Sequence, residues 1–130
     1  MIQKNLHLLI STPIVLLAAL LYGMRPDAIF PCVLDISVNT PDEQSVFRAL
    51  MGLYLSMAVL WILGIIRLAF WKAATLSNLF FMAGIALGRL FSIVWDGIPS
   101  ELFFYGFLGE AILAVFAGYQ WLRFSGQESS

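Results

Sequence analysis

Four long apolar runs, separated by short polar segments, fill almost the whole chain. They cover Leu6–Gly23, Val46–Ile66, Ala73–Trp95 and Leu102–Leu122. Each run is close to the ~20 residues with which a helix crosses a hydrocarbon core about 30 Å thick. The pattern therefore predicts an all-α protein, an integral membrane four-helix bundle, in which residues 1–130 form a single transmembrane domain.

The composition indicates that these helices are solvated by a bilayer rather than by water. Hydrophobic residues make up 61% of the chain and charged residues 12%, and a soluble domain would carry about twice that charged fraction. The net charge of −1 and the lack of a basic stretch argue against nucleic acid as a partner. We interpret the first run as a retained span, because residues 22–25, Tyr-Gly-Met-Arg, make a poor signal-peptide cleavage site.

The charged residues that flank the runs predict an orientation in the membrane. Basic residues gather at the N-terminus, the second connection and the C-terminus: Lys4, Arg67, Lys72 and Arg123. The first and third connections have Arg25 as their one clear basic residue and are otherwise acidic, with Asp27, Asp35, Asp42, Glu43, Asp96 and Glu101. Lys and Arg mark the cytoplasmic side, so we expect both termini in the cytoplasm and residues 24–44 as an external loop. Aromatic residues at span ends, among them Tyr22, agree with this placement.

Three charged side chains lie inside the apolar runs. Arg48 lies a few Å below the external face, and Arg89 and Glu110 lie roughly 10 and 15 Å below it at ~1.5 Å per helical residue. At that depth a charge must face another charge or a wet cavity, since exposure to lipid is costly. We expect one polar cluster under the external face, which neighbouring polar residues complete: Tyr54, Ser92 and Asp96.

The cluster has more than one interpretation. In the first, its ion pairs only fix the helix register, as in an accessory or assembly subunit of a larger membrane complex. In the second, the arginines hold the head group of an amphiphilic ligand such as a lipid, an isoprenoid or a quinone, because a guanidinium suits carboxylate or phosphate and polarises a carbonyl. In the third, Glu110 is a candidate catalytic residue that transfers protons in a membrane enzyme.

The sequence contains no motif for a metal, a haem or another cofactor. Cys32 is the single cysteine and has no CxxC partner, so a soft metal site is not expected. His7 is the single histidine, which excludes a bis-histidine haem within one chain. We expect His7 near the cytoplasmic interface.

Glycines in the second and third runs predict where helices approach closely. Gly52 follows Arg48 by one turn, and Gly84 and Gly88 form a GxxxG pair. Small residues at this spacing allow close contact between helix backbones. The contact lies either within the chain or between two copies, so a homodimer or another membrane-protein partner remains open.

Two motifs resemble those of a family of small bacterial inner-membrane proteins that is catalogued only as a domain of unknown function. The first is Gly-Arg-Leu at residues 88–90 followed by Asp-Gly-Ile-Pro-Ser at residues 96–100, and the second is the arginine-containing stretch at residues 47–53. Glu110 matches the acidic position of the fourth span, whereas Met51 stands where the family often has a glycine. The resemblance covers most of the chain. It implies four spans in a layout similar to that of DoxX-like proteins and implies no reaction.

Overall fold

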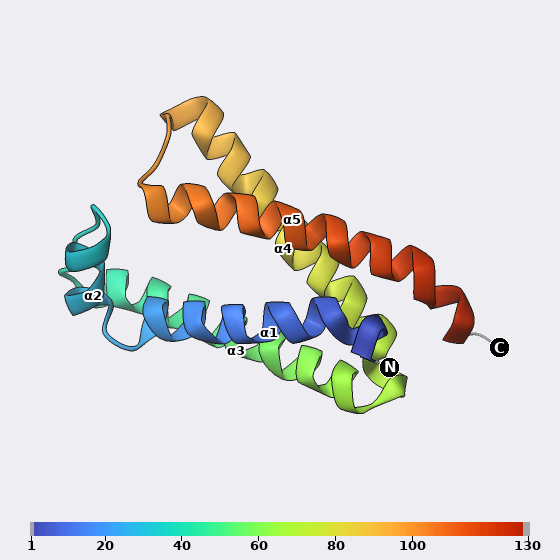
Figure 1. Ribbon diagram of the computed structural model, residues 1–130. Coiled ribbons are helices and arrows are strands. Elements are labelled where there is room, and N and C mark those ends of the chain that lie inside the picture. Colours follow the sequence, from blue (N-terminus) through green and yellow to red (C-terminus); the bar gives the residue numbers. More distant parts are fainter. Residues whose placement is uncertain (1, 129–130) are drawn as a thin grey trace.

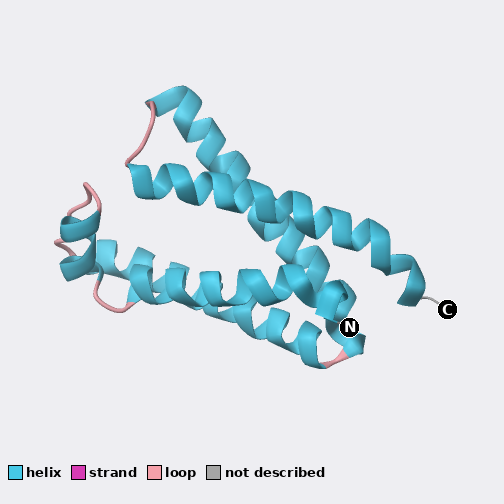
Figure 2. Ribbon diagram, in the orientation of Figure 1, coloured by secondary structure: helices cyan, strands magenta, loops and turns pink. Residues whose placement is uncertain are grey.

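The computed structural model describes residues 2–128, which are helical almost throughout and contain no strand (Figure 2). The elements are α1 (Ile2–Gly23), α2 (Pro26–Val33), α3 (Pro41–Ile66), α4 (Trp71–Asp96) and α5 (Glu101–Phe124), with short 3-10 helices η1 (Leu68–Phe70) and η2 (Ser125–Glu128). The all-α prediction is therefore confirmed.

Within residues 2–128, four helices are long and apolar enough to cross a membrane. They are α1, α3, α4 and α5, and each contains one of the apolar runs. The protein is thus a multi-pass membrane protein by the length and composition of its helices. The segment 24–44 also contains a short helix, α2, which was not predicted. Pro26 and Asp27 start α2, as proline at the first helical position and an acid in the first turn commonly do.

The helices form two pairs (Figure 1). α1 lies alongside α3, and α4 crosses behind α5 in this view. The start of α1, the end of α5 and η1 lie at one end of the molecule, which we call the η1 end. The other end, which we call the α2 end, holds α2 and the connection between α4 and α5. Toward the α2 end, α5 and α4 diverge from α1 and α3, and this divergence positions the candidate site.

Close packing ties the helices together at the η1 end. Trp61 and Trp71 are fully buried. The indole of Trp61 donates a hydrogen bond to the Ser77 hydroxyl at 3.1 Å, which joins α3 to α4. At Gly64 the backbones come so close that an added Cβ would overlap the Cβ of Ala74. The bundle is therefore tight at this end.

The glycines singled out in the sequence do not make close contacts within the chain. A methyl group added at Gly52, Gly84 or Gly88 would meet no neighbouring atom within 4 Å. The close approaches occur at Gly64 and at Gly23, where an added Cβ would overlap Met51. The reason is that GxxxG spacing fixes which glycines share a helix face, but not which way that face turns. Contact between two copies at Gly84 and Gly88 stays a prediction.

Local signals define the helix ends at the α2 end of the molecule. The Thr40 hydroxyl accepts a hydrogen bond from the Glu43 amide at 3.2 Å, and the Glu43 carboxylate accepts one from the Thr40 amide at 3.1 Å. This reciprocal pair is a capping box that starts α3. α4 ends at Asp96, and the next residue, Gly97, has a φ of 100°. Glycine adopts this angle readily, whereas other residues adopt it only with strain.

Thr40→Ala is expected to lower the free energy of unfolding by about 1 kcal/mol, because α3 loses its N-cap hydrogen bond. Thermal unfolding in detergent, followed by helix content, measures the change. Ser37→Ala is the matched control, because Ser37 is exposed and lies outside the capping box. Equal melting temperatures for the two variants would show that the capping box contributes nothing.

Candidate functional site

Arg89 and Glu110 form an ion pair between α4 and α5. The Nε of Arg89 donates to the Oε2 of Glu110 at 2.7 Å, and the two side chains are 21% and 18% exposed. The Nη2 of Arg89 also donates to the Tyr22 hydroxyl at 3.3 Å. The guanidinium carbon lies 4.9 Å from the centre of the Phe103 ring, a cation–π contact. Arg89 thus connects three helices with a satisfied, half-buried charge.

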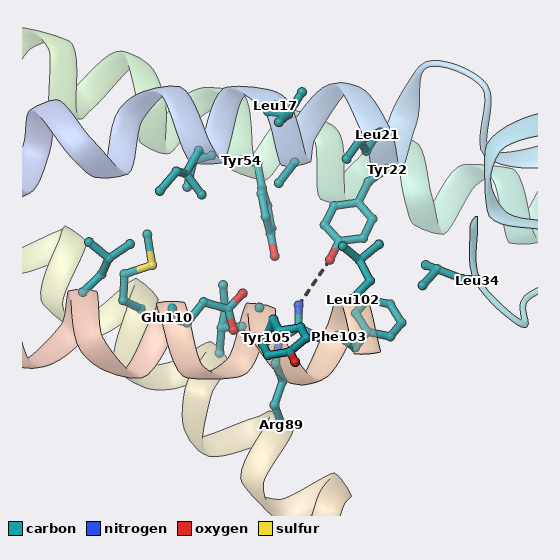
Figure 3. Close-up of a pocket in the computed structure, with 18 of the residues that line it drawn as sticks. Leu17, Leu21, Tyr22, Leu34, Tyr54, Arg89, Leu102, Phe103, Tyr105 and Glu110 are labelled. Carbon is teal, nitrogen blue, oxygen red and sulfur yellow. Dashed lines mark hydrogen bonds and ion pairs between the residues drawn. The ribbon is translucent and has the colours of Figure 1, made fainter. Parts of the chain in front are cut away.

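Two tyrosines face this ion pair from the opposite pair of helices. Figure 3 shows Tyr22 on α1 and Tyr54 on α3 pointing toward Arg89 and Glu110. The two tyrosine rings pack edge to face with their centres 5.4 Å apart. Tyr54 was expected in the cluster, whereas Tyr22 was assigned to the membrane interface. Its position at a span end gave no signal of a second role, because aromatic residues are common there.

A cavity of about 340 Å³ lies beside the ion pair. All four long helices and α2 line it, and its walls are mainly aliphatic and aromatic. Its polar groups are the charges of Arg89 and Glu110 and the hydroxyls of three tyrosines, Tyr22, Tyr54 and Tyr105. An apolar cavity with a few polar groups that converge on one region is the usual form of a small-molecule site.

The cavity is closed toward the η1 end. Val15, Met82 and Leu113 line it from α1, α4 and α5 and are themselves buried. Alanines of α5 that are also buried, Ala114 and Ala117, continue the core beyond them. This apolar floor separates the cavity from the η1 end, so the cavity is a blind pocket rather than a channel.

A second polar layer lies beyond this floor and was not predicted. His7 is fully buried rather than interfacial, and its Nε2 lies 2.9 Å from the Thr75 hydroxyl. Ser11 and Asn78, one turn further along α1 and α4, are also fully buried. The sequence signal was present, since polar residues recur at one-turn spacing on both helices, but only the contact between α1 and α4 brings them together.

The cavity opens sideways, between α1 and α5. Leu17 on α1 and Leu102 and Tyr105 on α5 line it and are exposed. Figure 3 shows Leu102 and Tyr105 near the ion pair and Leu17 farther from it on α1. On α2, Phe30 lines the cavity and is almost completely buried, so α2 covers the α2 end. In a bilayer this lateral opening would face acyl chains.

Comparison with protein-family models gives a match over residues 4–121, to a family described as a domain of unknown function, DUF4345. The chain belongs to this family. Comparisons with curated proteins and with solved structures gave no significant match. Both members of the ion pair lie within the region that the DUF4345 model covers.

One residue of the expected cluster, Arg48, lies outside the cavity of this DUF4345 chain. Its Nη1 donates to the backbone carbonyl of Gly23 at 3.0 Å and its Nη2 to the side chain of Gln44 at 3.4 Å. Gly23 is the last residue of α1, where unpaired carbonyls and the negative end of the helix dipole attract a cation. Arg48 therefore caps α1 and does not join Arg89.

Ser92 and Asp96 also lie away from the ion pair. The Ser92 hydroxyl donates to Asp96 Oδ2 at 3.0 Å, and both residues are exposed. They follow Arg89 on nearly the same side of α4, but α4 diverges from α5 beyond the crossing point (Figure 1). Of the predicted cluster, the structure thus brings together Tyr54, Arg89 and Glu110.

Within residues 2–128 of the DUF4345 chain, no three His, Cys, Asp or Glu side chains lie close enough together to hold a metal ion. Cys32 is an exposed free thiol on α2. The polar groups that line the cavity are a guanidinium, a carboxylate and phenols, which can donate and accept hydrogen bonds within apolar walls.

Proposed function

We propose that the protein binds an amphiphilic ligand in the cavity between its two helix pairs. Lipids, isoprenoids and quinones belong to this class. The head group lies against Arg89, Glu110 and the tyrosine hydroxyls, and the tail extends through the opening between α1 and α5. The observation that carries this proposal is an apolar cavity of about 340 Å³ with an ion pair in its wall.

An ion pair that only fixes helix register gives no reason for such a cavity. Protein interiors are close-packed and contain few voids larger than a water molecule, whereas ligand cavities are typically about 300–1,000 Å³. The volume is at the small end of that range, so it accommodates a head group and the first part of a chain. The rest of a long tail would lie among the acyl chains beyond Leu17 and Tyr105.

The proposed location is a bacterial inner membrane, with both termini in the cytoplasm. The basic residues at the η1 end, including Lys4, Arg67 and Lys72, support this orientation. The α2 end then faces outward, and the ligand enters from the outer leaflet.

The other two functions predict different results. If the protein is an accessory subunit, its purification in mild detergent should recover a stoichiometric protein partner. The exposed Gly84 and Gly88 on α4 would suit such a contact. An enzyme should turn its ligand over, so Glu110→Gln should accumulate the ligand unchanged. Binding without turnover, by a chain that purifies without a partner, would favour the amphiphile-binding function over both.

Gly109→Phe is expected to reduce the ligand that co-purifies with the protein about tenfold, because a phenyl ring fills the cavity. Gly109 lines the cavity, and a Cβ at this position meets no neighbouring atom within 4 Å. The ring should therefore enter without disturbing the helix contacts. Mass spectrometry of lipids extracted from the purified protein measures the loss, with thermal unfolding as a check on the fold.

Gly84→Phe is the matched control, because Gly84 is equally open but does not line the cavity. It should retain the same extracted lipids as the unmodified chain. If Gly109→Phe is folded and keeps its lipid complement, the cavity is not the binding site and the proposed function is wrong.

A further inference from the structure

The cavity carries no net charge. Arg89 and Glu110 are the charged residues among its lining side chains, and they neutralise each other at 2.7 Å. Two further arginines toward the α2 end also have partners. Arg25 pairs with Asp27 at 3.5 Å, and Arg48 bonds to the end of α1. The lining of the cavity therefore has no unmatched cation to balance an anionic head group.

The ion pair nevertheless keeps hydrogen-bonding capacity for a ligand. Arginine has five N–H donors, and the contacts within residues 2–128 use its Nε and Nη2, which leaves Nη1 without a protein partner. Glu110 accepts through Oε2, and its Oε1 makes no hydrogen bond within these residues. Arg89 thus keeps a donor and Glu110 an acceptor, and both residues line the cavity.

An anionic head group at Arg89 would either lie beside the Glu110 carboxylate, which repels it, or displace that carboxylate from Arg89. Displacing the carboxylate would leave it in apolar surroundings beside a second negative charge, and an unpaired charge in such a site is costly. An uncharged hydroxyl or carbonyl can instead accept a hydrogen bond from Nη1, and a hydroxyl can also donate to Oε1, with the ion pair intact. An uncharged head group therefore gains hydrogen bonds without the electrostatic cost that an anionic head group incurs.

We infer that the cavity selects amphiphiles whose head group is an uncharged oxygen function, a hydroxyl or a carbonyl, and that Glu110 excludes anionic head groups. This inference rests on the proposed function and specifies its ligand class. Glu110 is then a specificity-determining residue, and Arg89 supplies the hydrogen bond that holds the head group.

A matched pair of probes tests the inference: a C15 isoprenoid alcohol with a photoreactive diazirine near the head group, and the monophosphate of the same alcohol. The full chain in phosphatidylcholine nanodiscs is irradiated with each probe, and labelled residues are identified by peptide mass spectrometry. We expect the alcohol to label cavity residues of α1 and α5 about tenfold more than the monophosphate does. Excess unlabelled alcohol should abolish this labelling.

The outcomes separate the inference from the proposed function. Equal or stronger labelling of the cavity by the monophosphate would overturn the preference for an uncharged head group and leave amphiphile binding standing. Labelling of the cavity by neither probe would count against the proposed function as well. Labelling spread over all lipid-facing residues, with no competition, would show partition into the bilayer only and would overturn both.

Glu110→Gln tests the role of the carboxylate directly. This variant leaves Arg89 as the one charge in the cavity wall, so labelling by the monophosphate should rise about tenfold and the preference should reverse. Glu101→Gln, at the exposed start of α5, is the matched control and should keep the preference for the alcohol. An unchanged ratio in folded Glu110→Gln would exclude Glu110 as the selecting group. If that variant does not fold, the probe comparison on the unmodified chain decides the inference.

Discussion

Arg89→Leu is expected to lower the free energy of unfolding by about 3–5 kcal/mol, because it leaves Glu110 in the bundle without its partner. The same change should remove the co-purifying ligand, since Arg89 provides the free donor at the cavity wall. The 2.7 Å contact between Nε and Oε2 and the bond to Tyr22 are lost together. Unfolding in mixed micelles measures the stability, and lipid extraction measures the ligand.

The double variant Arg89→Leu/Glu110→Leu separates the two effects. Removing both charges replaces the ion pair by apolar side chains, which is often neutral for stability. We expect the double variant to regain most of the stability and still to lack the ligand. A double variant that keeps its full ligand would refute binding of a head group at this ion pair.

Arg48→Leu serves as the matched arginine control. It removes a cation of the same type from a neighbouring helix, at a position outside the cavity. The ligand should remain at the level of the unmodified chain, with a stability loss of about 1.5–3 kcal/mol from the hydrogen bond to the end of α1. Loss of the ligand in this variant would mean that Arg48, and not Arg89 alone, contributes to binding.

Among glycine-to-alanine substitutions at the contact between α3 and α4, Gly64→Ala should lower the free energy of unfolding most. The new Cβ would overlap the Cβ of Ala74, so the two backbones must separate. Overpacking of this kind typically costs about 1–3 kcal/mol. The variant should therefore melt well below the unmodified protein, as measured by helix content during heating in detergent.

Two further variants test this explanation. Ala74→Gly in the Gly64→Ala background moves the methyl group from one helix to the other and should restore much of the lost stability. Gly84→Ala adds a methyl group in open space and should be neutral or stabilising by about 0.5–1 kcal/mol. If Gly64→Ala and Gly84→Ala behave alike, close approach at Gly64 does not stabilise the bundle.

The sequence by itself determined the positions of the long helices and the presence of charged residues inside them. Runs of about 20 apolar residues can satisfy their backbone only as helices in a bilayer, so the spans followed from hydropathy along the chain. Arg89 and Glu110 could be assigned to one polar cluster because a charge at that depth needs another charge or a wet cavity, but the same reasoning also placed Arg48 there. The capping residues Thr40 and Glu43 and the turn at Gly97 are local signals of the same kind.

Only the tertiary structure decided which side of each helix faces inward. In a soluble helix, polar residues mark the outer face, but in lipid both the inner and the outer face are apolar. Arg48 and Gly52 share one face of α3, and the sequence could not show which way that face turns. In the structure both residues are exposed and lie outside the cavity lining. The crossing of α4 behind α5, beyond which Asp96 lies away from Glu110, depends on packing between different helices (Figure 1). The cavity lies where α4 and α5 diverge from α1 and α3, because side chains that pack together at the η1 end no longer meet at the α2 end.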